Sequence, residues 1–104
     1  MIEAASPEAS ALLASLHARA FPKPWSAAEI GKLMENRAVF ALLSGNGAEP
    51  RGFVMAWAAA GDAELLTVAV VPEARRKGIG AGLVTAAGVA ALVRGSASIH
   101  LEVA

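Results

Sequence analysis

The stretch Arg75-Arg76-Lys77-Gly78-Ile79-Gly80 constrains the fold of this chain more than any other segment. It joins an apolar run, residues 65–71, to a helical pattern that begins near Ile79, so it predicts a strand, a basic glycine turn and a helix. The first amide groups of a helix have no partner inside the helix and carry partial positive charge, so a phosphate can bind there. The two glycines allow close approach of the backbone. The three basic residues supply the charge that a ligand with several phosphates requires.

Two known phosphate-binding motifs do not match this turn. A Walker loop closes with Gly-Lys-Ser or Gly-Lys-Thr, whereas Gly80 is followed by Ala81-Gly82-Leu83. A dinucleotide fingerprint that starts at Gly78 needs a third glycine where Leu83 stands, and it needs an acidic residue about 20 positions later in a second βαβ unit. The remaining alternative to a phosphate site is a surface turn whose basic side chains are solvated.

What remains is the pattern Arg-x-x-Gly-x-Gly, after a strand that ends Val68-Ala69-Val70-Val71-Pro72. This combination resembles the acetyl-CoA site of the GNAT family of N-acetyltransferases. Two further segments, Phe21-Pro22-Lys23-Pro24-Trp25-Ser26 and Leu101-Glu102-Val103, are similar to landmarks of the bacterial members that acetylate the N-terminal alanine of a small-subunit ribosomal protein. All four segments occur here in the order in which those enzymes carry them.

The resemblance implies an acetyl-CoA-dependent N-acetyltransferase whose acceptor is a primary amine, foremost the N-terminal α-amine of a protein or peptide. It also implies that residues 68–70 pair through their backbone with the pantetheine arm, as an added strand does, while the turn binds the pyrophosphate. The expected acetyl-CoA-binding residues are therefore Val68, Ala69, Val70, Arg75, Arg76, Lys77, Gly78, Ile79, Gly80 and Ala81. The alternative for the strand residues is ordinary pairing with a neighbouring strand.

Glu102 is the expected catalytic base. An α-amine titrates near 7.7 to 8.0, so a single carboxylate is enough to neutralise it. Strand alternation places the apolar residues 99, 101 and 103 on one side and Glu102 on the other. The resemblance gives Glu102 the position of the family's catalytic glutamate. Two alternatives stay open: a solvated glutamate on an edge strand, or catalysis by Glu64, which lies at the end of its strand far from the phosphate turn.

Residue patterns along the chain predict an α+β fold in the order βααβββαβ, GNAT-like, with a mixed, mostly antiparallel sheet flanked by helices. Strands are expected over residues 2–5, 38–43, 52–59, 64–71 and 98–103. The middle strands form an antiparallel meander, and the last strand runs parallel to residues 64–71 after a right-handed crossover.

Each expected helix has its own start signal or apolar stripe. Ser6 caps the first helix, with Pro7 at its first position, and the capping box of Ser26 and Glu29 starts the second. The expected buried residues are Leu12, Leu13, Leu16 and Ala20 in the first helix, Ile30, Leu33 and Met34 in the second, and Ile79, Leu83, Ala86, Ala90 and Val93 in the third.

For four aromatic or imidazole residues, we expect a structural role before a functional one. Phe53 and Trp57 alternate on one strand face and are expected in the core. Trp25 follows two prolines and is interpreted first as a core side chain and second as part of a substrate-side loop. His17 is expected on a helix surface or near the helix C-terminus, where the helix dipole favours it.

Composition excludes several function classes. The sequence has no cysteine, which excludes disulfides and thiol nucleophiles, and its two histidines do not indicate a metal site. Nine basic and nine acidic residues balance, so we expect no nucleic-acid partner. Hydrophobic residues make up 56% of the chain, yet no run approaches the roughly 20 apolar residues of a membrane span. No secretory signal is visible at the start, so a soluble cytoplasmic protein is expected.

The chain departs from the family after Leu101-Glu102-Val103. Family members continue with Arg-x-x-Asn, then a helix with a Leu-Tyr pair, then further strands, and their general acid is that tyrosine; this sequence contains no tyrosine. We therefore expect residues 1–104 to be one domain that lacks the C-terminal helix and strands, as a fragment of a longer protein. Its exposed C-terminal strand edge offers a place for dimerisation. The alternative is a degenerate relative, a non-catalytic CoA-binding or interaction module.

Overall fold

The computed structural model describes residues 1–45, 49–97 and 99–100. Its elements, in chain order, are β1 (Ile2–Ala5), η1 (Pro7–Ala9), α1 (Ser10–Ala20), α2 (Ala27–Met34), β2 (Val39–Ser44), β3 (Gly52–Ala59), β4 (Asp62–Val70), η2 (Pro72–Ala74) and α3 (Ile79–Val93). The two η elements are single turns of 3₁₀ helix.

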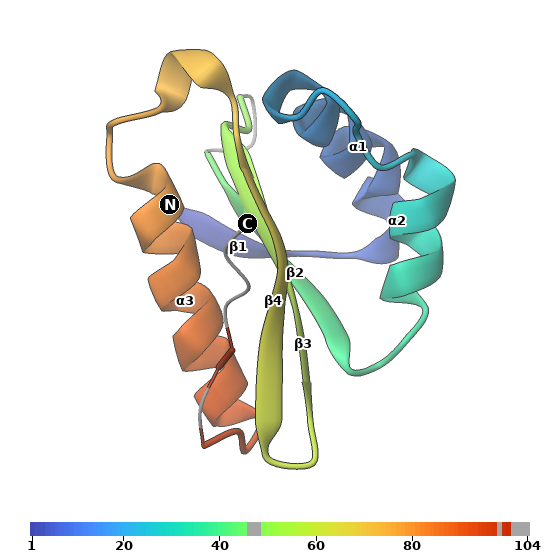
Figure 1. The fold of residues 1–104 in the computed structure, drawn as a ribbon, viewed down its shortest axis with the longest axis vertical. Helices are drawn as coiled ribbons and strands as arrows, with labels where there is room; N and C mark the ends of the chain where they lie inside the picture. The colour runs from blue at the N-terminus through green and yellow to red at the C-terminus, as the bar shows by residue number, and fades with distance from the viewer. Residues whose placement is uncertain (46–48, 98, 101–104) are drawn as a thin grey trace.

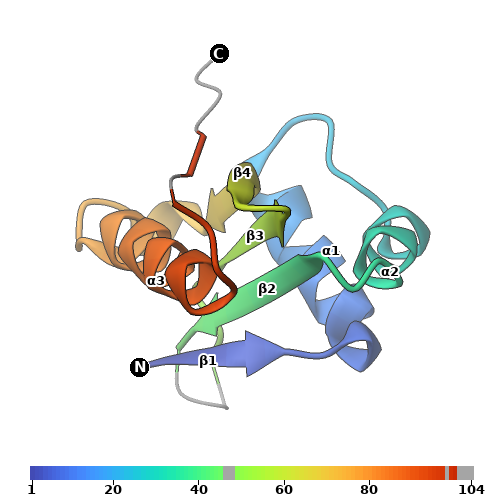
Figure 2. The same cartoon turned by 90° about the horizontal axis from the view of Figure 1, so that it is seen from below.

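The four strands form one antiparallel sheet in the order β1-β2-β3-β4. Helices α1 and α2 cover one face of this sheet and α3 covers the other (Figures 1 and 2). The predicted α+β class, with a mostly antiparallel sheet flanked by helices, is confirmed.

Strand β3 carries the centre of the core because it is buried on both faces. Phe53 and Met55 point into a cluster with α1 and α2, whereas Val54 and Ala56 point into a cluster with α3. This alternation follows from the twofold side-chain period of a strand. It places Phe53 in the core, as predicted, while Trp57 is half-buried against the same cluster.

The start of the first helix differs from the prediction. Ser6 precedes the 3₁₀ turn η1, its side chain makes no capping hydrogen bond, and α1 begins at Ser10. Leu12 is also 36% exposed, because the buried face of α1 passes through Leu13 and Leu16 instead. By contrast, the predicted capping box of α2 is present: Ser26 Oγ accepts from the Glu29 amide at 3.1 Å, and Glu29 Oε1 accepts from the Ser26 amide at 2.9 Å.

The buried stripe of α3 is also different from the predicted one. The buried residues are Leu83, Ala87 and Ala91, which follow one another at spacings of four, whereas Val93 is 82% exposed. The helix sequence is apolar on all sides, with Thr85 as its single hydroxyl-bearing side chain, so periodicity could not identify the buried face.

A hairpin and a bulge shape β4. Ala60 and Gly61, with φ values of 54° and 87°, form the two-residue turn between β3 and β4. Further along, Met55 pairs with Thr67 while Ala56 pairs with Leu65, so Leu66 is an extra residue, a β-bulge. A bulge strengthens the local twist and shifts which backbone groups face the sheet edge.

The structure describes only the beginning of the expected last strand. Glu64 and His100 form a parallel bridge: the Leu65 amide donates to the His100 carbonyl at 2.9 Å, and the His100 amide donates to the Ala63 carbonyl at 2.7 Å. The parallel direction agrees with the predicted crossover through α3. Ser98 and residues 101–104, including Glu102, lie outside the described residues.

Candidate functional site

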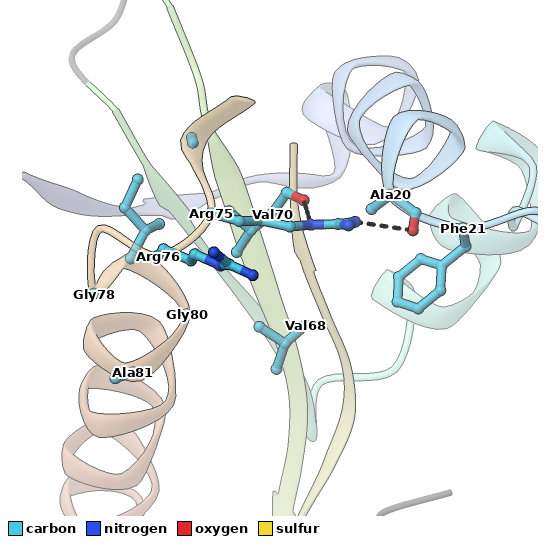
Figure 3. Close-up of a pocket in the computed structure, with 11 residues that line it drawn as sticks. Ala20, Phe21, Val68, Val70, Arg75, Arg76, Gly78, Gly80 and Ala81 are labelled. Carbon is cyan, nitrogen blue, oxygen red and sulfur yellow. Dashed lines mark hydrogen bonds between the residues drawn. The ribbon is translucent and has the colours of Figure 1, made fainter. Parts of the chain in front are cut away.

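A cavity of about 470 Å³ lies between the start of α3, the outer edge of β4 and the end of α1 (Figure 3). It contains most of the residues that the sequence singled out for acetyl-CoA: Val68, Val70, Arg75, Arg76, Gly78, Ile79, Gly80 and Ala81. Three further residues, Ala20, Phe21 and Ala74, complete the lining. The fold therefore gathers the strand and the glycine turn around one space.

The N-terminus of α3 opens into this cavity. Gly78 is the residue that precedes the helix, with a left-handed φ of 78°, and no side chain caps the helix there. The first amide to bond back is that of Gly82, which donates to the Gly78 carbonyl at 2.9 Å. The amides of residues 79–81 precede that bond, so they have no partner within the helix. Such a helix end attracts an anion.

Gly80 keeps this space open. A Cβ at this position would meet only Val70 Cγ2, at 3.8 Å, which is an ordinary contact distance. Its φ is not in the left-handed region, so neither packing nor backbone conformation requires glycine here. The absence of a side chain instead leaves room for a group to approach the helix end.

The outer edge of β4 supplies the second wall. Val71 donates its amide to the Arg51 carbonyl at 2.9 Å, on the side of β3. Because successive strand residues present their backbone groups to opposite edges, those of Val70 and Val68 point away from β3. The Val70 carbonyl indeed accepts from Arg75 Nε at 3.1 Å. This edge is available to an extended ligand in the manner of an added strand.

The Arg75 side chain lines the cavity between β4 and α1, and it extends away from the glycine turn. Its guanidinium spans from the Val70 carbonyl to the Ala20 carbonyl, where the second bond is 3.2 Å long (Figure 3). The Ala20 carbonyl is one of the unpaired acceptors at the C-terminus of α1, which a cation stabilises. Arg76, in contrast, has a left-handed φ of 65° and extends into the cavity.

Two expected acetyl-CoA residues lie outside this cavity. Ala69 is 1% exposed and its side chain belongs to the core cluster on the α1 and α2 face, one strand position out of phase with Val68 and Val70. Lys77 lines a separate depression together with Arg51 and Glu73. Direct contact of Ala69 and Lys77 with acetyl-CoA remains a prediction.

Of the two candidate bases, the structure describes only Glu64. Glu102 lies outside the described residues, so its role remains a prediction. Glu64 is exposed, pairs with Trp57 near the hairpin turn, and does not line the cavity.

Within residues 1–45, 49–97 and 99–100, no group of three His, Cys, Asp or Glu side chains could hold a metal ion. None of the helices in that part combines the length and apolarity needed to cross a bilayer.

Phe21, which lines the cavity, belongs to an aromatic cluster with His17 and Trp25. The His17 ring stacks on Phe21 at 4.4 Å between centroids and on Trp25 at 4.8 Å. His17 Nδ1 accepts from the Trp25 amide at 3.1 Å, and Nε2 lies 3.2 Å from Thr67 Oγ1. His17 is only 3% exposed. It does lie in the last turn of α1, as predicted, but the expected surface position is wrong, because the following segment folds back over the ring.

Burial also sets the ionisation of this cluster. Desolvation lowers the pKa of His17 below its usual 6.5, and the nearby carboxylate of Glu29 opposes this only in part. The pKa of Glu29 is lowered from 4.5, chiefly by the hydrogen bonds from the backbone and side chain of Ser26. At neutral pH the site thus holds a neutral imidazole and an ionised carboxylate.

Solved structures of acetyltransferases share this fold. The ribosomal-protein-S18-alanine N-acetyltransferase from Escherichia coli matches with a TM-score of 0.89 and 21% identity, over 99% of this chain and 66% of that one. The ribosomal-protein-alanine N-acetyltransferase from Brucella melitensis matches with a TM-score of 0.79 and 20% identity, over 100% of this chain and 79% of its own. The chain thus spans about two thirds of the length of the first of these enzymes.

A third neighbour was solved with a ligand derived from CoA. AAC(6')-Iy, solved in complex with the bisubstrate analogue CoA-S-monomethyl-acetylneamine, matches with a TM-score of 0.83 and 14% identity, over 100% of this chain and 79% of that chain. No curated protein matches the sequence significantly. The sequence model of the acetyltransferase (GNAT) family matches residues 10–104. The chain belongs to the GNAT family of acetyltransferases.

Proposed function

We propose that this protein transfers the acetyl group of acetyl-CoA to a primary amine, foremost the N-terminal α-amine of a protein. One observation carries the proposal: a single cavity joins an uncapped helix N-terminus to an outward-facing strand edge. Those are the two features that a ligand with a pyrophosphate and an extended amide-containing arm requires. The neighbour bound to a CoA-derived bisubstrate analogue supports the same ligand class.

In this proposal the phosphates bind at the start of α3. The amides of residues 79–81 donate to the pyrophosphate, and Arg76 adds its charge from the preceding turn. The pantetheine arm then runs along β4, where the backbone groups of Val68 and Val70 face outward. Arg75 holds the ends of β4 and α1 together, so it shapes the cavity as well as adding positive charge.

Acetyl transfer itself needs a neutral amine. Glu102 accepts a proton from the ammonium form, directly or through water, and the amine nitrogen attacks the thioester carbonyl. A C–N bond forms and the C–S bond breaks through a tetrahedral oxyanion. As the amide forms, the attacking nitrogen loses a second proton, and the departing thiolate takes up one proton to give CoA; because a thiol has a pKa of about 8.5, the thiolate leaves readily.

The acceptor class rests on the structural neighbours. The TM-score of 0.89 with the ribosomal-protein enzyme supports an N-terminal α-amine. The amine of an aminoglycoside is the second candidate, since an aminoglycoside acetyltransferase from a soil metagenomic sample shares the fold with a TM-score of 0.80. Acetylation of an alanine-initiated peptide and of an aminoglycoside by the same preparation will rank the two.

Substitution of Gly80 tests the cofactor assignment. Acetyl-CoA should raise the melting temperature of the wild-type protein, since a ligand that binds the native state stabilises it. Gly80→Asp places a negative charge against the phosphates and should abolish this shift; an aspartate in the first helical turn is otherwise favourable, so the fold should persist. Gly88→Asp is the control, because position 88 lies in the same helix with open space around it. An undiminished shift in Gly80→Asp would reject the assignment.

Substitution of Glu102 tests the catalytic step. Glu102→Gln retains the size of the side chain but cannot accept the proton, so the rate of transfer at pH 7 should fall about 10²- to 10⁴-fold. Acetyl-CoA binding should be unchanged, and the defect should shrink as the pH rises above the pKa of the amine. Glu64→Gln serves as the comparison, with near-normal rates expected. A wild-type rate in Glu102→Gln together with a loss in Glu64→Gln would transfer the role to Glu64.

A further inference from the structure

His17 is a buried ionisable group that the proposed chemistry does not use. It is 3% exposed and lies at the junction of three segments: the end of α1, the loop of residues 21–26 and strand β4. Phe21 and Trp25 stack on it, and Phe53 lies at 6.2 Å in a tilted arrangement. A polar ring in such surroundings needs partners for its nitrogens, and the partners fix its chemical state.

The hydrogen bonds of His17 define one tautomer. The Trp25 amide can only donate, so Nδ1, at 3.1 Å from it, must carry a lone pair and no hydrogen. The hydrogen of the neutral ring is then on Nε2, which donates to Thr67 Oγ1 at 3.2 Å. Protonation of Nδ1 would place two N–H groups against each other and break the bond to Trp25.

These two bonds tie the loop of residues 21–26 to the sheet. The Phe21 ring stacks on the imidazole and the Trp25 amide donates to it, so the His17 side chain contacts both ends of the loop. Thr67 pairs with Met55 at the bulge of β4. The Phe21 ring, held by the stack, lines the cavity on the opposite side from Gly78 and Gly80 (Figure 3).

The placement of Phe21 links this cluster to the acceptor. If the phosphates of acetyl-CoA bind at the start of α3, its arm extends from there along the outer edge of β4, and Phe21 lies on the cavity wall opposite the glycine turn, where the acceptor approaches. We propose that the neutral imidazole of His17 is a positioning group that fixes the Phe21–Trp25 loop as the acceptor-side wall of the cavity, and that its protonation releases this wall. The inference rests on the function proposed above.

The surroundings of His17 determine how it responds to pH. The side chains that contact the ring from the loop, from β3 and from β4 are Phe21, Trp25, Phe53 and Thr67, and none of them carries a charge. From α2, the Glu29 carboxylate favours protonation, but desolvation outweighs it and the pKa of His17 is lowered. The imidazole therefore stays neutral at pH 7 and gains its proton only as the pH falls below 6.5.

Nitrogen NMR and tryptophan fluorescence test the tautomer and its titration without any acceptor. The protein contains two histidines, so the imidazole nitrogens of His17 can be assigned with His17→Phe. At pH 7.5 we expect the Nε2–H tautomer, with a titration midpoint below 6.5. In a Trp57→Phe background, the fluorescence of Trp25 should be quenched with the same midpoint, because an imidazolium would then stack on the indole. An Nδ1–H tautomer, or a midpoint at or above 6.5, would overturn the proposal.

Steady-state kinetics test the positioning role. His17→Phe keeps the ring stack but removes both hydrogen bonds, so the acceptor KM at pH 7.5 should rise by about tenfold, while the acetyl-CoA Kd changes less than twofold. Thr67→Val removes one bond and should raise the acceptor KM by about two- to tenfold, the usual worth of a neutral hydrogen bond; Thr67→Ser should restore it. Below pH 6.5 the acceptor KM of the wild type should rise more steeply than that of His17→Phe, because protonation of the acceptor amine affects both proteins alike.

Two outcomes separate the inference from the function on which it rests. A wild-type protein that binds acetyl-CoA but acetylates no amine would refute the proposed function, and with it the acceptor role of His17. Normal transfer with an acceptor KM unchanged in both Thr67→Val and His17→Phe would refute the positioning role alone. If His17→Phe does not fold, Thr67→Val and its Thr67→Ser rescue decide, since they leave the buried ring in place.

Discussion

The two faces of the sheet are packed with side chains of very different size. On the face of α1 and α2, three of the eleven buried residues are alanines, and the large buried side chains include Leu13, Leu16, Ile30, Phe53 and Met55. On the face of α3, most buried residues are alanines, namely Ala56, Ala58, Ala63, Ala87 and Ala91, with Leu83 as the largest fully buried side chain.

This difference in side-chain size gives the two faces different roles: the α1 and α2 face contributes more to stability, and the α3 face sets the geometry of the site. Burial of large apolar side chains provides most of the hydrophobic stabilisation, so the α1 and α2 face carries the larger share. Small side chains let a helix lie close to its neighbour, since packing distance depends on the residues at the contact. The alanines therefore let α3 approach the sheet and bring its N-terminus beside the edge of β4, where the cavity lies.

Truncation of Leu13 should give the largest effect on stability. Leu13→Ala leaves a cavity in the large-residue core and should lower the free energy of unfolding by about 2 to 5 kcal/mol in urea denaturation. Leu12→Ala is the matched control on the neighbouring, 36% exposed position and should cost about 0.5 kcal/mol. Where Leu13→Ala is still folded, its acetyl-CoA affinity should be normal. Equal losses in the two variants would contradict the packing described for α1.

Enlargement of Ala87 should affect stability less and binding more. Ala87→Leu overpacks the contact between α3 and the sheet, with a cost of about 1 to 3 kcal/mol. Because the added side chain pushes α3 away from β4, we also expect weaker acetyl-CoA binding, measured by calorimetry. Val93→Leu, at a position 82% exposed on the same helix, should change neither quantity. Normal acetyl-CoA binding in Ala87→Leu would show that the packing of α3 against the sheet does not determine the geometry of the binding site.

Removal of the α2 cap should give the smallest effect. Ser26→Ala deletes the bond to the Glu29 amide and should cost about 1 kcal/mol at pH 7, without a change in acetyl-CoA affinity. Ser6→Ala, which loses no bond to a helix backbone amide, should cost less than about 0.5 kcal/mol. Thermal denaturation of both variants provides the comparison. An equal cost at the two serines would show that the cap contributes nothing.

The cap also gives stability a predictable pH dependence. The folded pKa of Glu29 is lower than 4.5, so its contribution is fully present above that value and is lost as the pH falls through the folded pKa. His17 acts in the same direction at higher pH: its folded pKa is lower than 6.5, the unfolded chain binds more protons, and stability declines as the pH falls below 6.5. His17→Phe should remove the second decline and leave the first.

Local patterns predicted the elements that depend on few neighbours. The capping box of Ser26 and Glu29 and the strand, turn and helix around Gly78 have the expected form. Each of them rests on interactions within a few residues, so the sequence alone contains the information. For the same reason the sequence identified the cavity-lining residues of this segment, which are all of residues 75–81 except Lys77.

Longer-range features could not be found in this way. The apolar sequence of α3 has no polar face, so the sheet alone decided that Leu83, Ala87 and Ala91 are buried. The bulge at Leu66 depends on how β4 pairs with β3, and strand phase then placed Ala69 in the core while Val68 and Val70 reached the cavity. No pattern within β4 shows which of its faces meets which helix.

By itself, the sequence determined the order of strands and helices, the strand, glycine turn and helix around Gly78, and the family to which the chain belongs. The tertiary structure decided that Phe21 enters the cavity wall, that Arg75 joins β4 to α1, and that His17 is buried as a neutral ring. The physical reason is sequence distance. The partners of these side chains, such as Thr67 for His17 and Ala20 for Arg75, lie 50 or more residues away, and only the packed sheet brings them within hydrogen-bonding range.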